Sequence, residues 1–334
     1  MRVAINGFGR IGRTVYRILH ERDDINVVAI NDLFDHEALA YLLQYDTIMR
    51  KFPEKVTTSA GYLHTSRDKV KMLSERELEG LDWGALDIDV VVESTGMFTS
   101  REQLEHHLAA GAKRVVLTVP AKDDIDITVV IGVNEDTLKP EHRIISTASC
   151  TTNCLAPMAK ILHENFGIVE GIINTVHAYT NDQRLADVPH KDLRRSRAAA
   201  ENIIPTTTGA ARAVGLVLPE LQGRLDGIAS RVPVPDGSVV DLVVELERKV
   251  TPGDIHQAVH EATLSPRLKP ILSYSSSPVV SRDIIGDPHS SIYDAPFTRV
   301  TGGNFVKTLN WYDNEWAYAN RVVDLIGILK ELDA

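Results

Sequence analysis

Short apolar runs alternate with amphipathic stretches over the first 150 positions of the chain. Arg2–Asn6 and Ile25–Asn31 are short and rich in apolar residues, which predicts buried strands, and Arg13–His20 between them has one apolar helical face. Further strands are predicted at Ile88–Glu93, Arg114–Val119 and Ile127–Val133, and further helices at Glu37–Gln44 and Arg101–Ala110. Strands that alternate with helices predict an α/β domain with a doubly wound, mostly parallel sheet.

The pattern changes after Cys150. Thr151–Phe166 predicts a helix that ends at Gly167. Longer strand-like runs follow at Ile168–Tyr179, Leu225–Val234, Ser238–Leu246 and Phe305–Tyr312, and a last amphipathic helix covers Ala317–Leu332. This half is therefore predicted to be α+β with a mostly antiparallel sheet. We expect one domain at residues 1–149, completed by the C-terminal helix 315–334, and a second at 150–314.

Composition narrows the class of protein. A length of 334 residues with 43% hydrophobic residues fits two globular domains. The net charge of −10 argues against a general nucleic-acid or membrane-surface binder, and no apolar run approaches the ~18–20 residues that span a bilayer. The N-terminus does not have the order of a signal peptide, so we expect a cytoplasmic protein. Only two cysteines are present, and no HExxH motif, so we expect no metal site.

A glycine-rich turn, Gly7-Phe8-Gly9-Arg10-Ile11-Gly12, joins the first predicted strand to the first helix. A lone GxGxxG is weak evidence, but here it lies within a βαβ unit of about thirty residues, the context that a Rossmann dinucleotide site requires. Gly7 would permit the tight turn, Gly9 would let the backbone approach a pyrophosphate, and the amides of Arg10 and Ile11 would point at it.

Asp32 follows the second predicted strand, where an acidic side chain binds the ribose hydroxyls of a dinucleotide. Its carboxylate would repel a 2′-phosphate, so NAD is favoured over NADP. The alternative is that a surface acid merely happens to follow a glycine-rich turn.

The densest chemical signal is the segment Ser149-Cys150-Thr151-Thr152-Asn153-Cys154. Ser149 is a plausible N-cap, which places Cys150 in the first helical turn, where the helix dipole lowers a thiol pKa. We therefore expect a Cys150 thiolate, with nearby amides to stabilise an oxyanion. Cys154, one turn further in, is expected to be a buried packing residue.

A nucleophilic cysteine needs a base, and the chain has twelve histidines. His177 is the best candidate because it ends an apolar strand beside polar residues, although a lone histidine there is more often structural. Two further clusters indicate phosphate binding: a basic run at 190–197, and Thr206–Gly209 before a helical pattern. The basic run is equally consistent with a solvent-exposed loop that binds no phosphate.

Together these residues resemble the phosphorylating glyceraldehyde-3-phosphate dehydrogenases, from Val3 to the C-terminal helix. The segments that carry the resemblance are AINGFGRIGR at 4–13, SCTTNCLAP at 149–157, YTNDQ at 179–183, PHKDLRR at 189–195, IIPTTTGAA at 203–211 and WYDNEW at 311–316.

The resemblance implies that NAD oxidises glyceraldehyde 3-phosphate and that inorganic phosphate accepts the acyl group, which gives 1,3-bisphosphoglycerate. Cys150 would be the nucleophile that forms a thiohemiacetal and then a thioester, and His177 the base. Substrate and phosphate contacts are implied for Ser149, Thr151, Thr180, Arg195, Thr208, Gly209 and Arg231, and cofactor contacts for Gly7, Gly9, Arg10, Ile11, Asp32, Arg76, Thr118 and Asn314. The family implies a homotetramer, in which residues from about 179 to 202 form an S-shaped loop.

Some positions depart from the usual family pattern: Thr147, Ala178, Val188 and the pair Asp236-Gly237. Ala178 also resembles the NADP-using biosynthetic branch, whereas Asp32 and Pro189 match the NAD-using branch. The alternatives are such an NADP-preferring enzyme, the related erythrose-4-phosphate dehydrogenase, or an NAD-sensing or nucleic-acid-binding protein with a vestigial site.

Overall fold

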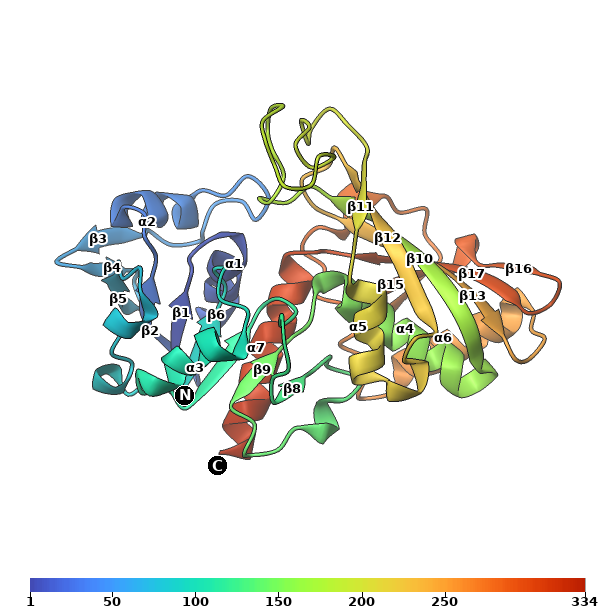
Figure 1. The fold of residues 1–334 in the computed structure, drawn as a ribbon, viewed down its shortest axis with the longest axis horizontal. Coiled ribbons are helices and arrows are strands. Elements are labelled where there is room, and N and C mark those ends of the chain that lie inside the picture. Colours follow the sequence, from blue (N-terminus) through green and yellow to red (C-terminus); the bar gives the residue numbers. More distant parts are fainter. Residues whose placement is uncertain (334) are drawn as a thin grey trace. The chain divides into compact units, whose positions relative to one another are not determined.

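The computed structural model describes residues 1–333, which form two compact units (Figure 1). The first unit holds residues 1–129, 136–148 and the end of the chain from Ala319. The second holds residues 130–135 and 149–318. Each unit has its own β-sheet.

The first unit is built on a nine-stranded sheet in the order β3-β4-β5-β2-β1-β6-β7-β9-β8. Its strands are β1 (Arg2–Asn6), β2 (Asn26–Asn31), β3 (Thr57–Ser59), β4 (Tyr62–His64), β5 (Lys69–Leu73), β6 (Val90–Glu93), β7 (Arg114–Leu117), β8 (Ile127–Thr128) and β9 (Ile144–Ser146). All neighbours from β5 to β8 pair in parallel, and β3 and β4 add an antiparallel edge. The strand order reverses at β1, so the carboxyl ends of β1, β2 and β6 border the crevice where such sheets bind ligands.

Helices pack on this sheet and bury its apolar side chains. They are α1 (Arg10–Leu19), α2 (His36–Gln44), α3 (Arg101–Ala109) and the C-terminal part of α7 (Trp316–Leu332). α1 packs against β2, and α3 packs against β7 and β9. Ion pairs between Lys330 and Asp24, and between Arg114 and Asp333, hold the end of the chain in this unit.

The second unit is built on an eight-stranded mixed sheet in the order β11-β12-β10-β13-β17-β15-β14, with β16 paired to β17. Its strands are β10 (Ile168–Ala178), β11 (Ile204–Thr207), β12 (Leu225–Val232), β13 (Ser238–Leu246), β14 (Leu272–Ser275), β15 (Ser291–Asp294), β16 (Arg299–Thr301) and β17 (Phe305–Tyr312). Most pairs are antiparallel, as expected, but β10 pairs in parallel with β12, and β14 with β15. Periodicity identifies a strand but not the direction of its neighbour, so the mixed pairing was not predicted.

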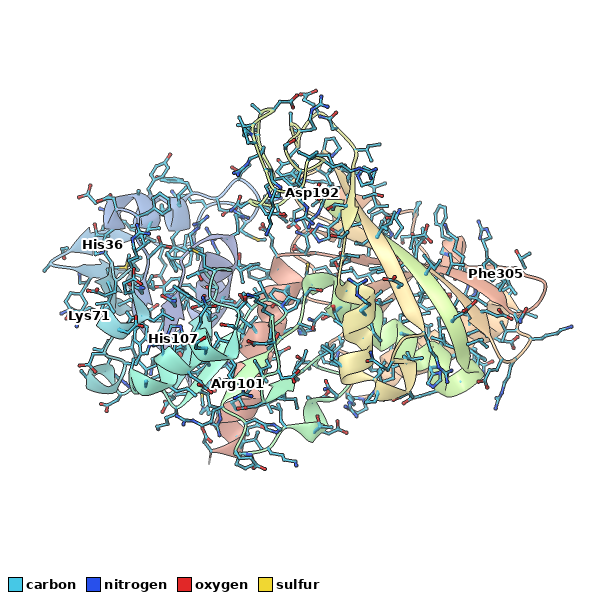
Figure 2. The ribbon with its side chains drawn as sticks, viewed as in Figure 1. His36, Lys71, Arg101, His107, Asp192 and Phe305 are labelled. Atoms are coloured by element: carbon cyan, nitrogen blue, oxygen red, sulfur yellow. The ribbon has the colours of Figure 1, made fainter. Side chains whose placement is uncertain are left out.

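One face of this second sheet is covered by helices. They are α4 (Cys150–Phe166), α5 (Ala210–Val217) and α6 (Pro252–Leu264). α4 packs against β10, β13, β15 and β17, and α5 packs against β12. On the opposite face Ile172, Ile228 and Phe305 are exposed within the chain. Phe305 is labelled in Figure 2.

The strand predicted at Ile127–Val133 is shorter than expected, because β8 ends at Thr128 and the chain then turns into the second unit. Arg267 holds this segment there: its guanidinium donates to the Val133 carbonyl at 3.0 Å and pairs with Glu135 at 2.8 Å. The predicted domain limits, 1–149 and 150–314, place residues 130–135 in the first domain, whereas the structure places them in the second unit.

Candidate active site

Cys150 is the first residue of α4, as the N-cap pattern predicts. The Ser149 hydroxyl accepts a hydrogen bond from the Thr152 amide at 3.0 Å and so caps the helix. The capping residue has an extended backbone, which turns the chain sharply into the helix. Cys150 is half-buried, whereas Cys154 is fully buried, and its thiol donates to the Asn310 carbonyl at 3.5 Å. Neither cysteine is in a disulfide.

The Cys150 sulfur lies 3.5 Å from Nε2 of His177, near the end of β10. Nδ1 of His177 lies 2.7 Å from the Ala178 carbonyl and 2.8 Å from Nη1 of Arg231. A carbonyl only accepts and a guanidinium only donates. Nδ1 can therefore donate to the Ala178 carbonyl or accept from Arg231, but it cannot do both. Nη1 already has two oxygen acceptors, the Ala178 carbonyl at 3.0 Å and the Thr180 hydroxyl at 3.1 Å. We therefore assign the proton to Nδ1, which leaves the Nε2 lone pair facing the sulfur.

The electrostatic environment keeps both partners uncharged in the free protein. Burial, and then the charge of Arg231, lowers the pKa of His177 to about 3. Burial raises the pKa of Cys150 to about 11, although the charge of Arg231 and the hydroxyl and amide of Thr151 act in the opposite direction. The expectation of a resting Cys150 thiolate is therefore wrong for this structure, because loss of hydration outweighs the helix amides.

Side chains suited to phosphate gather beyond the end of β10. Arg231 lies beside His177 on β12 and donates to Thr180, whose hydroxyl donates to the carboxylate of Asp182. Arg195 forms an ion pair with the same carboxylate, and its Nε donates to the Thr206 hydroxyl at 2.9 Å. Asp182 thus joins two of the predicted phosphate ligands, a role that the sequence analysis missed. Its position within the YTNDQ segment was the only available signal.

The predicted residues Ser149, Thr151, Thr208 and Gly209 lie at two adjacent helix starts. Gly209 is the N-cap of α5, and the Thr208 hydroxyl accepts from the Ala210 amide at 3.2 Å. The Thr152 hydroxyl donates to the Ala210 carbonyl at 3.4 Å, which joins the start of α4 to that of α5. Two helix starts side by side provide amides and hydroxyls suited to an anion.

The glycine-rich turn of the first unit has the geometry that a dinucleotide requires. Gly7 has a φ of +92°, and a Cβ there would lie 2.6 Å from the Thr95 amide nitrogen. Gly9 is the N-cap of α1, and a Cβ built on it meets nothing within 4 Å. Gly12 lies so close to the turn that a Cβ would be 2.1 Å from the Gly7 carbonyl oxygen. Open space at Gly9 next to the first amides of α1 fits a pyrophosphate.

The other predicted cofactor contacts lie in both units. Asp32 follows β2, and one of its carboxylate oxygens accepts from the Phe8 amide of the turn at 2.7 Å. Arg10 pairs with Asp46. The remaining three are Arg76, exposed after β5, Thr118, buried after β7, and Asn314, buried in the second unit.

Comparison with known proteins agrees with this architecture. The family model described as "Glyceraldehyde 3-phosphate dehydrogenase, NAD binding domain" matches residues 1–101, and "Glyceraldehyde 3-phosphate dehydrogenase, C-terminal domain" matches residues 149–314. The glyceraldehyde-3-phosphate dehydrogenase of Thermotoga maritima is 58% identical over 333 residues, 99% of each chain. Those of Streptomyces coelicolor and Geobacillus stearothermophilus are 56% and 55% identical over 97% and 98% of each chain. The chain belongs to the glyceraldehyde-3-phosphate dehydrogenase family.

This membership confirms the family, the α/β fold class, and the prediction of an NAD-dependent oxidoreductase. The roles of the individual site residues in this dehydrogenase stay predictions. Two residues that sequence reasoning overlooked support them. The Ser238 hydroxyl accepts from the amide of Ala178, next to His177, and donates to Asn314 at 2.6 Å. The Tyr312 hydroxyl contacts Thr151 at 2.8 Å.

Two features are absent from the part of this dehydrogenase that the structure describes. Within residues 1–333, no helix is both long and apolar enough to pass through a bilayer. In the same residues, no three His, Cys, Asp or Glu side chains come together as ligands for a metal ion.

Proposed function

We propose that the protein oxidises glyceraldehyde 3-phosphate to 1,3-bisphosphoglycerate, with NAD as oxidant and inorganic phosphate as acyl acceptor. The observation that carries this proposal is the contact of 3.5 Å between the sulfur of Cys150 and Nε2 of His177, at the start of a helix. A thiol beside a neutral imidazole is a nucleophile with its base in place.

The chemistry begins with transfer of the Cys150 proton to Nε2 of His177 as the sulfur attacks the aldehyde carbon. The imidazolium N–H stabilises the oxyanion that forms and then gives it the proton, so the product is a neutral thiohemiacetal and His177 is neutral again. His177 then takes the hydroxyl proton as a hydride leaves the same carbon, so the carbon is oxidised to a thioester on Cys150. Inorganic phosphate attacks the thioester, the C–S bond breaks, and the acyl phosphate leaves with Cys150 restored.

The phosphate groups are assigned to the two clusters beside the dyad. Thr180, Arg195 and Arg231 provide two guanidinium groups and a hydroxyl, which suit a phosphate dianion. The adjacent helix starts, with Ser149, Thr151, Thr208 and Gly209, suit a second anion. Asp182 forms an ion pair with Arg195 in the free protein. A phosphate that binds Arg195 must displace this carboxylate from the guanidinium.

The dinucleotide supplies the hydride acceptor when it is bound. Within the first unit, Gly7, Gly9, Arg10 and Ile11 would hold its pyrophosphate, and Asp32 its adenosine ribose. Arg76, Thr118 and Asn314 complete the proposed set. Asp32 disfavours a 2′-phosphate, so NAD is the proposed cofactor and NADP the weaker ligand.

We further propose a cytoplasmic homotetramer. Two free cysteines suit a reducing compartment. The face of the second sheet opposite α4 has a hollow of about 350 Å³, whose lining includes Ile172, Val243 and Phe305. The proposed S-shaped loop, with Asp192 labelled in Figure 2, exposes Leu185 by 85% and Leu193 by 81%. Exposed apolar surface of this kind is typical of contacts between subunits.

The mechanism is tested with Cys150→Ser, assayed for NADH formation from glyceraldehyde 3-phosphate and phosphate. We expect turnover to be abolished while NAD binding, measured by calorimetry, stays within about twofold. The matched control is Cys154→Ser, because Cys154 lies one turn further along the same helix and is fully buried. Unchanged turnover in Cys150→Ser would overturn the mechanism.

The substrate is tested by assays of the wild-type protein with glyceraldehyde 3-phosphate and with erythrose 4-phosphate, each with and without phosphate and with NAD or NADP. We expect a strict need for phosphate, and preference for the three-carbon aldehyde and for NAD. Preference for erythrose 4-phosphate or NADP would replace the proposal with the corresponding enzyme. No activity with any phosphorylated aldehyde would indicate a vestigial site.

A further inference from the structure

A chain of polar side chains crosses the carboxyl edge of the first sheet beneath the glycine-rich turn. At its centre, the Glu93 carboxylate at the end of β6 accepts a hydrogen bond from the side-chain amide of Asn6 at 2.6 Å. Asn6 ends β1 and accepts from the Asn31 side chain at the end of β2, at 2.8 Å. Asn31 in turn accepts from the Glu75 amide at 2.8 Å and donates to the Glu75 carbonyl at 2.9 Å. Side-chain bonds therefore tie β6, β1, β2 and the segment after β5 into one row.

The other end of the chain is fixed by a buried histidine on α3, His107, which is labelled in Figure 2. The Trp83 indole nitrogen lies 3.0 Å from Nδ1 of His107, and Nε2 of His107 lies 3.0 Å from Glu93. An indole N–H can only donate, so Nδ1 must accept and Nε2 carries the proton. His107 therefore donates to Glu93, and the relative exposure of Trp83, His107 and Glu93 is 0%.

The second oxygen of Glu93 accepts from the amide of Thr95, at 2.9 Å, and from its hydroxyl. Thr95 forms the floor of the turn, since its amide nitrogen is the atom that a Cβ on Gly7 would strike. The neighbouring Ser94 hydroxyl donates to the Gly7 carbonyl at 2.7 Å. Glu93 thus accepts four hydrogen bonds, the full capacity of an ionised carboxylate.

Three members of this row come directly before a proposed cofactor contact in the sequence. Asn6 precedes Gly7, Asn31 precedes Asp32, and Glu75 precedes Arg76. The Glu93 carbonyl also accepts from the amide and the hydroxyl of Thr118, both at 3.0 Å.

We propose that Glu93 is a positioning residue for the dinucleotide site, acting through Asn6, Asn31 and Thr95 without touching the cofactor. This inference rests on the proposed cofactor contacts. Burying a carboxylate is costly unless it is fully hydrogen-bonded, and a fully bonded polar network holds its members in one geometry. The row holds four strand ends in register, so the backbone that meets the dinucleotide is ordered before binding.

The test is Glu93→Gln, which keeps the side-chain shape but turns one acceptor end into a donor. One oxygen of Glu93 accepts from Thr95, and the other accepts from Asn6 and His107. In the variant, the donors on one of these two sides face an N–H instead of an oxygen. We expect the Kd for NAD, measured by calorimetry well below the melting temperature, to rise about tenfold. The KM for NAD should rise in parallel, while kcat at saturating NAD and the KM for the aldehyde stay within about twofold.

The matched control is Tyr16→Phe, which removes another hydrogen bond to a carboxylate of the first unit, the partly buried bond from Tyr16 to Asp68 at 2.8 Å. This variant should lower the melting temperature and leave the Kd for NAD unchanged. If Glu93→Gln behaves in the same way, Glu93 has only a structural role and the proposal is wrong.

If Glu93→Gln does not fold, Asn31→Ala decides the question by cutting the row between Asn6 and Glu75. It should raise the Kd for NAD about tenfold, and an unchanged Kd would overturn the proposal. Direct binding also separates this inference from the proposed reaction. A wild-type protein that binds NAD but does not turn over the aldehyde refutes the reaction and leaves the positioning test valid.

Discussion

At the scale of single residues, opposing electrostatic effects set the reactivity of Cys150. Burial raises its pKa to about 11, while the charge of Arg231 and the Thr151 amide favour the thiolate. Burial and Arg231 together keep His177 neutral and so able to accept the thiol proton. Arg231 therefore affects both partners, since its charge stabilises the thiolate and disfavours the imidazolium.

This arrangement predicts the effect of removing the Arg231 charge. In Arg231→Gln the thiol pKa should rise further, and one pKa unit lowers the thiolate fraction at pH 7 about tenfold. Alkylation of Cys150 by iodoacetamide, followed by mass spectrometry of the peptide, should slow by about that factor. The control is Arg212→Gln, since Arg212 lies exposed on α5 and pairs with Asp226. Equal alkylation rates in wild type and Arg231→Gln would show that this charge does not act on the thiol.

At the scale of elements, the start of α1 combines two different uses of glycine. Gly12 is required by packing, because a Cβ there would lie 2.1 Å from the carbonyl oxygen of Gly7. Gly9 has space around it and an ordinary φ of −73°, so the fold itself does not require glycine there. This open space is what the proposed approach of a pyrophosphate to the backbone requires.

Alanine substitutions at these two positions should separate stability from binding. Gly12→Ala should lower the free energy of unfolding by about 1–3 kcal/mol, the usual cost of overpacking, as measured by urea denaturation. Gly9→Ala should change that energy by less than about 0.5 kcal/mol while the Kd for NAD rises. If Gly9→Ala binds NAD as tightly as the wild type, the turn does not hold the pyrophosphate.

At the scale of the whole molecule, the second sheet has one face covered by α4, α5 and α6 and one that this chain leaves open. Strand register places Ile172, Ile228 and Phe305 on that open face, together with charged residues such as Asp241 and Lys307, which pair at 2.6 Å. A mixed apolar and charged face is suited to contact with a second copy of the chain.

The assembly prediction is tested with Ile172→Glu, because Ile172 is 66% exposed at the centre of this face. Burying an unpaired charge at an interface is costly, so we expect the tetramer to dissociate to smaller species in sedimentation velocity. Leu264→Glu is the matched control, since Leu264 is also 66% exposed but lies on α6. A protein that sediments as a single chain before mutation would refute the tetramer.

The elements were largely predictable because their signals are local. β13 and β17 have the bounds that their apolar runs predict, and the cap at Ser149 places Cys150 at the start of α4. Short strands with mixed character, such as β3 and β9, give no such periodic signal and were missed. The first turn of α1 was also missed, because it lies within the glycine-rich motif itself.

The sequence by itself determined which segments become helices and strands, that a dinucleotide turn opens α1, and that a cysteine begins α4. Each depends on residues within a few positions of one another. Only the tertiary structure decided that His177, of twelve histidines, meets Cys150, and that Asp182 joins Thr180 to Arg195. It also decided that burial outweighs the Arg231 charge and the Thr151 amide at the thiol, and that Glu93 joins four strand ends. These outcomes depend on distances and hydration set by distant parts of the chain.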